Sequence, residues 1–197
     1  MYVTCYRELS ERGGVERQIL MGAIKSLSRS YPAALSALQG LRDAAMQRVM
    51  VNLNDRAAIS EVAQLNERLG QSATSVALYD SLPPLHPGRQ GLASIAGTAF
   101  LEARRYRDVL IGEPFGNMLT NFERLAGSTQ KLSGQSAVNM HGSLVSNTLA
   151  DIEALTGTGQ LSEAKTLTGK LLALDDSEAT RAALQRHLDR ATQAPGR

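Results

Sequence analysis

Apolar residues recur every three or four positions along almost the whole chain, and this spacing most constrains the fold. Because an α-helix has 3.6 residues per turn, such spacing places apolar side chains on one face of each helix. β-Branched or aromatic runs of the kind that favour strands are scarce. Phe, Tyr and Trp make up only 4% of the residues, and Trp is absent. The sequence therefore predicts an all-α protein packed through small and medium side chains.

Helix-ending residues divide this pattern into about ten helices joined by short turns. Asp55 is a good N-cap for a helix that Gly70 would end, and Pro83 and Pro84 should stop the helix that follows. The polar, glycine-containing stretch 128–136 is expected to be a loop. The expected helices cover approximately residues 15–28, 32–51, 56–69, 72–82, 89–103, 106–112, 115–126, 137–156, 161–174 and 178–193.

Two segments of the chain match at a spacing of 34 residues. Ala63 in the first segment corresponds to Gly97 in the second, and Ser75 corresponds to Val109. The string AGTAFLEARRYRDVL, at 96–110, resembles the first helix and turn of a tetratricopeptide repeat. That family needs a small residue where the two helices of a pair cross closely, because a larger side chain would push them apart. The resemblance makes Ala63 and Gly97 the small residues of their first helices.

The resemblance implies an all-α, right-handed α-α superhelix of antiparallel helix pairs. It predicts one repeat domain over 15–193, after a lead-in over 1–14 and before a tail over 194–197. The expected repeat copies lie near 15–55, 56–89, 90–123 and 145–178, with a capping helix over 178–193. Asn66 and Val109 depart from the family pattern, and the region 114–144 does not keep the period.

Charge and composition argue against several classes of function. The net charge is only +2, and basic residues alternate with acidic ones, so the sequence predicts no nucleic-acid surface. No run of about 18 apolar residues is present, so we expect no membrane-spanning helix. Cys5 is the only cysteine, which makes an intramolecular disulfide impossible. We expect a soluble protein, in the cytoplasm unless a signal peptide has been removed.

The residues that could carry chemistry do not form a recognisable site. His86, His141 and His187 lack ligand spacing, so the sequence predicts neither a metal nor a cofactor. His141 lies near Ser143 and Asp151, but no Gly-x-Ser-x-Gly turn accompanies them. An α-helical enzyme is therefore the least favoured of three hypotheses.

The favoured hypothesis is a non-catalytic scaffold that binds a peptide or partner protein in the groove of the superhelix. Carrying the family's groove positions onto this chain predicts the partner-binding residues Ser60, Gln64, Glu67, Ser94, Thr98, Leu101 and Glu153. The alternative is a self-associating structural or regulatory domain of a larger protein or complex. It is motivated by Phe115 and Phe122, which lie on an apolar stripe in the segment that breaks the period.

Overall fold

The computed structural model describes residues 22–27 and 31–193, in which all regular structure is α-helical. Ten helices, α3 to α12, are bounded within these residues, and 22–27 are helical as well. The predicted all-α fold class is confirmed. The expected lead-in over 1–14, the tail over 194–197 and most of the expected helix over 15–28 lie outside the described residues. No helix in the described part is long and apolar enough to cross a membrane.

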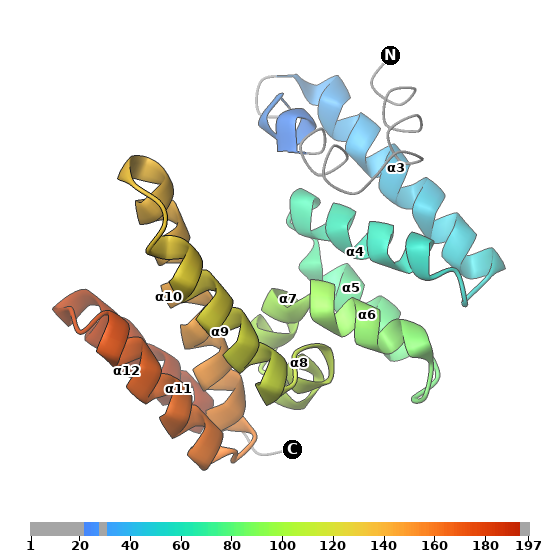
Figure 1. The fold of residues 1–197 in the computed structure, drawn as a ribbon. Helices are drawn as coiled ribbons and strands as arrows, with labels where there is room; N and C mark the ends of the chain where they lie inside the picture. Colours follow the sequence, from blue (N-terminus) through green and yellow to red (C-terminus); the bar gives the residue numbers. More distant parts are fainter. Residues whose placement is uncertain (1–21, 28–30, 194–197) are drawn as a thin grey trace. The chain divides into compact units, whose positions relative to one another are not determined.

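The chain divides into two compact units between Ala99 and Phe100. The division falls inside the repeat copy expected over 90–123, and one continuous domain over 15–193 stays a prediction. The helices of the first unit are α3 (Pro32–Val51), α4 (Arg56–Leu69), α5 (Ser72–Ser81) and α6 (Pro87–Ile95), and α7 (Gly97–Glu102) crosses the division (Figure 1). Those of the second unit are α8 (Tyr106–Gly112), α9 (Phe115–Thr129), α10 (Gly134–Gly157), α11 (Leu161–Leu174) and α12 (Glu178–Thr192).

Helix α4 organises the first unit, because it packs against α3, α5 and α6. Helix α4 begins and ends where the sequence predicts. The Asp55 side chain accepts a hydrogen bond from the Ala58 N–H, and Gly70 ends the helix with φ 69°. One cluster of this unit's buried apolar side chains consists of Ile24, Ala34, Leu38, Leu41 and Leu65.

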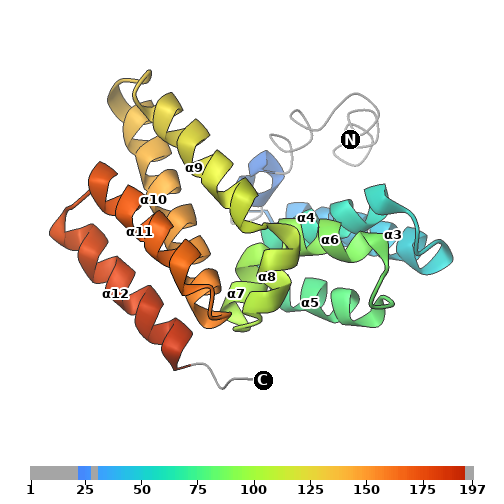
Figure 2. The ribbon, with the colours of Figure 1, turned by 60° about the horizontal axis from the view of Figure 1, so that its bottom comes forward.

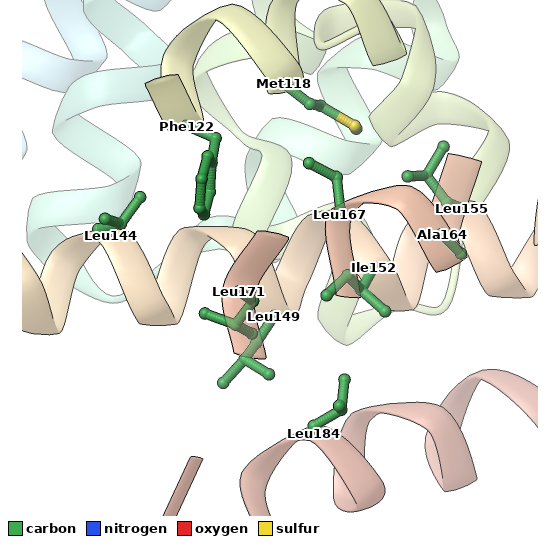
Figure 3. Packing of buried hydrophobic residues seen from close by; sticks show 10 residues of the cluster. All are labelled: Met118, Phe122, Leu144, Leu149, Ile152, Leu155, Ala164, Leu167, Leu171 and Leu184. Atoms are coloured by element: carbon green, nitrogen blue, oxygen red, sulfur yellow. The ribbon is translucent and has the colours of Figure 1, made fainter. Parts of the chain in front are cut away.

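Helix α10 has the same role in the second unit, where α8, α9, α11 and α12 all pack against it. Figure 2 shows α9, α10, α11 and α12 as successive antiparallel rods. The buried core is formed by Met118, Phe122, Leu144, Leu149, Ile152, Leu155, Ala164, Leu167, Leu171 and Leu184 (Figure 3). Only Leu184 in this cluster comes from α12.

Three helix pairs share one turn geometry. The first helix of each pair ends one or two residues before a residue in the left-handed region. The N–H of the residue that follows this left-handed residue donates a hydrogen bond to the carbonyl five residues back. The left-handed residues are Gly70, Arg104 and Gly159, with φ 69°, 55° and 80°. The bonds are Gln71 to Asn66, Arg105 to Phe100 and Gln160 to Leu155, each 2.8 Å long. The 34 residues between Gly70 and Arg104 equal the repeat length found in the sequence.

The structure corrects two helix boundaries. The helix expected over 89–103 is broken at Ala96, because Ala96 has φ −94° and ψ 20° and leaves the helical path before Gly97. The loop expected over 128–136 is shorter, since α9 runs to Thr129 and α10 starts at Gly134. The hydroxyls of Ser128 and Thr129 donate to carbonyls one turn back, which lets these polar residues continue α9.

The role expected of Gly97 as a small residue stays a prediction. A Cβ built on Gly97 meets no atom of the described residues within 4 Å, so alanine would fit there as well as glycine. The close approaches occur at other glycines. A Cβ on Gly88 would lie 2.6 Å from Ile59, and one on Gly157 would lie 2.1 Å from the Tyr106 ring. Ala63, the other predicted small residue, is buried at 1% exposure.

Candidate functional site

The predicted groove residues of the first unit lie on α4, α6 and α7. Glu67, Ser94 and Thr98 are exposed, whereas Ser60 and Gln64 are half-buried. The Gln64 amide donates a hydrogen bond of 3.3 Å to the Ser60 hydroxyl, one turn away on the same helix. Four of these polar side chains lie on α4 and α7, the first helices of their pairs, and Ser94 lies on α6, before the break at Ala96.

Two predicted groove residues have different surroundings. Leu101, at the end of α7, is half-buried. Glu153, on α10, is buried, and its side chain is only 1% exposed. Glu153 therefore lies inside the second unit. In this conformation a partner could not contact its side chain, because α12 covers it.

The Glu153 carboxylate is the centre of a polar cluster that joins three helices. It accepts hydrogen bonds from the Tyr106 hydroxyl of α8 at 3.1 Å and from Nδ1 of His187 on α12 at 2.6 Å. The guanidinium of Arg190, also on α12, donates to the same carboxylate at 2.6 Å. Since a buried carboxylate without partners is costly, these three donors explain how Glu153 is tolerated inside the unit.

The electrostatics of the cluster keep Tyr106 protonated. Burial raises the pKa of the Tyr106 hydroxyl, and the negative charge of Glu153 raises it further. The tyrosine is therefore a hydrogen-bond donor at neutral pH. Its ring packs directly on Gly157, which has no side chain to obstruct it. This arrangement is suited to joining α8 to α10.

A shallow open hollow of about 480 Å³ lies on the α12 side of the cluster. Among the described residues, those that line it belong to the last turns of α12 and the residue after it: Arg186, His187, Asp189, Arg190 and Gln193. The described lining comes from one helix and the hollow is open, unlike an enclosed ligand pocket.

The residues considered for a catalytic triad do not make one. His141 pairs with Asp175 across 3.0 Å, and the Ser143 hydroxyl donates to the Asn139 carbonyl one turn back. Asp175 also accepts from the Thr180 hydroxyl at 2.8 Å, and these hydrogen bonds hold the pKa of its carboxyl well below its usual range. The pair connects α10 to the turn between α11 and α12.

His86 also has a structural partner. Its Nδ1 accepts a hydrogen bond of 3.0 Å from the Gly88 N–H and so caps the first turn of α6. The three histidines thus lie in three separate local networks. The described part of the chain contains no group of three or more His, Cys, Asp or Glu side chains placed to hold a metal ion.

A hydrogen bond in the first unit accounts for the buried polar residue Asn66. Asn66 is fully buried, and its amide donates to the buried Ser75 hydroxyl at 3.1 Å. The corresponding residues of the other turns are Phe100 with Val109 and Leu155 with Ala164. The Asn66–Ser75 pair therefore places a hydrogen bond between first and second helices at positions where the other two hairpins have apolar residues. The sequence indicates that Asn66 is unusual but does not identify Ser75 as its partner.

Comparisons with known proteins give no further information on this arrangement: no family model matches the chain, and neither curated proteins nor solved structures give a significant match.

Proposed function

We propose that this chain is a non-catalytic scaffold that binds a peptide or a partner protein along the first helices of its helix pairs. The observation that carries the proposal is the helical hairpin whose left-handed turn recurs at Gly70, Arg104 and Gly159. Proteins built from repeated hairpins present an extended surface on successive first helices. The tetratricopeptide resemblance and its superhelical groove are part of this proposal.

The chemistry of the surface supports recognition by hydrogen bonding. Glu67, Ser94 and Thr98 are exposed and polar, with a single formal charge among them. Such residues suit the backbone groups of an extended peptide or the polar face of a helix. Members of the family that grip a C-terminal carboxylate use lysine, arginine and asparagine in the groove. This chain has none of these at its matching positions, which argues for a different kind of partner.

In the first step of the test, the partner is co-purified from the native host and identified by mass spectrometry. Its Kd is then measured for the wild type and for the double variant Gln64→Ala/Glu67→Lys. We expect at least tenfold weaker binding by the variant, because the substitutions remove an amide and reverse a charge on α4. Ala77→Lys, which adds a charge at an exposed position of α5, is the control and should bind normally. Unchanged binding by the double variant would argue against the groove.

Self-association was the alternative suggested by Phe115 and Phe122. Phe122 is 8% exposed and belongs to the core of the second unit, and the half-buried Phe115 packs against that core. Their apolar surface therefore packs within the unit, which argues against this alternative. Sedimentation velocity over a range of concentrations tests it, and we expect a monomer.

A further inference from the structure

Glu153 differs from its counterparts in the other repeats. Aligned on the three shared turns, it corresponds to Gln64 on α4 and Thr98 on α7. Gln64 is half-buried and Thr98 is exposed, whereas the Glu153 side chain is 1% exposed. Helix α12 contributes to this burial, because it packs along α10 and places His187 and Arg190 on the carboxylate, to which Tyr106 of α8 also donates. Here α12 covers a surface that the proposed function assigns to a partner.

Few completely buried apolar side chains hold α12 in place. Its buried residues are Thr180, Leu184 and Ala191, and Leu184, the largest of them, remains 8% exposed. Helix α11 instead contributes Leu167 and Leu171 to the same core, both at 0% exposure (Figure 3). Ala183 and Leu188 of α12 also pack against this core but are only partly buried. Because burial of apolar surface is the main source of stability, we expect α12 to be held more weakly than α11.

The charged contacts of α12 do not make up this difference. Removing the Glu153 carboxylate from water costs free energy. Its pairing with Arg190 offsets most of this cost but adds little net stability. The Arg190 side chain is itself 49% exposed. If α12 left, Glu153 would regain water and Arg190 would lose little. The ion pair thus determines where α12 docks more than how firmly it docks.

We propose that α12 is a displaceable latch that opens while α10 and α11 stay folded. Opening exposes Glu153 to a partner helix that carries a histidine and an arginine one turn apart, as α12 itself does. The hinge is the connection between α11 and α12, residues 175–177. The partner's chemistry follows from the contacts that α12 makes in cis, and this inference rests on the proposed scaffold function.

Hydrogen exchange of the whole chain, read by mass spectrometry, tests the opening. We expect the amides of α12 to exchange at least tenfold faster than those of α11. Arg190→Gln should accelerate exchange in α12 about tenfold further and leave α11 unchanged, because it removes the positive charge that compensates Glu153. Arg186→Gln is the control, since it removes the same charge from an exposed arginine in the interior of the same helix. Equal exchange of α11 and α12 in the wild type overturns the proposal.

A labelled peptide of residues 177–193 tests the exposed surface. It should bind the His187→Gln/Arg190→Gln chain at least tenfold more tightly than the wild type, whose own α12 occupies the surface. Adding Glu153→Gln to the double variant should abolish this gain. Equal affinity for the wild type and the double variant overturns the proposal. Neither measurement requires the natural partner, so this inference and the groove test with Gln64 and Glu67 can fail independently.

Discussion

Two carboxylates of α10, Asp151 and Glu153, are separated by one residue but have opposite electrostatic surroundings. Glu153 faces the donors Tyr106, His187 and Arg190. Asp151 faces Glu113, which accepts a hydrogen bond from Asn121. Burial raises the pKa of the Asp151 carboxyl to about 7, and the negative charge of Glu113 adds to the effect. At neutral pH, then, Asp151 lowers the stability of its unit.

Asp151→Asn should stabilise the second unit at pH 8 and change little near pH 4. The folded wild type binds the Asp151 proton more tightly than the unfolded chain does, so its stability contribution is complete below about pH 4 and is lost as the pH rises toward 7. We expect a gain of roughly 2–4 kcal/mol at pH 8. Urea denaturation followed by circular dichroism measures it. A difference between variant and wild type that does not grow from pH 4 to pH 8 would contradict this explanation.

The contact between Gly157 and Tyr106 predicts a second effect at the residue scale. Gly157→Ala would place a methyl group 2.1 Å from the tyrosine ring, which must then move. We expect a loss of about 1–3 kcal/mol in the free energy of unfolding, measured by urea denaturation. Gly169→Ala, in the interior of α11, is the matched control, because a Cβ there meets nothing within 4 Å. It should add about 0.5–1 kcal/mol through helix propensity alone. Stabilisation by both variants would refute the close approach.

At the scale of the elements, the three turns are alike in backbone but not in sequence. Glycine occupies the left-handed position in two of them, and Arg104 occupies it in the third with φ 55°. A side chain in this region is strained, whereas glycine adopts it freely. The turn between α7 and α8 therefore forms despite an unfavourable residue, with the Arg105 N–H bonded to the Phe100 carbonyl at 2.8 Å.

Arg104→Gly should stabilise this turn by about 1 kcal/mol, because it removes the strain of the left-handed conformation. Thermal denaturation compares the variant with Arg186→Gly, in which an exposed arginine in the interior of α12 is lost. The second variant should cost about 1 kcal/mol, since glycine is a poor helix former. Equal losses in both variants would mean that Arg104 stabilises the turn by its side chain.

At the scale of the whole molecule, the second unit contains a complete core. All ten side chains of the main cluster come from α9 to α12, and the Glu153 cluster adds α8. A unit that buries its own apolar surface and pairs its own buried charge should not require the rest of the chain.

Residues 100–197 expressed alone should therefore fold. We expect a helical circular dichroism spectrum and one cooperative thermal transition, because the unit is of a size that usually unfolds in two states. Leu167→Ala in this fragment should lower its stability by about 2–5 kcal/mol, since it opens a cavity in the core. A fragment without a cooperative transition would show that the division at Ala99 does not separate independent folding units.

The sequence by itself determined the all-α fold class and most helix ends. Asp55, Gly70 and Ser177 act on backbone groups within a few residues of themselves, so local sequence identifies them. Only the tertiary structure decided which distant polar residues meet. Glu153 with His187, and His141 with Asp175, are 34 residues apart and on different elements, and no local pattern brings them together. Glu153 is a predicted groove residue, yet its side chain is buried. The sequence does not show this burial, because α12 lies outside the α10–α11 hairpin that contains Glu153.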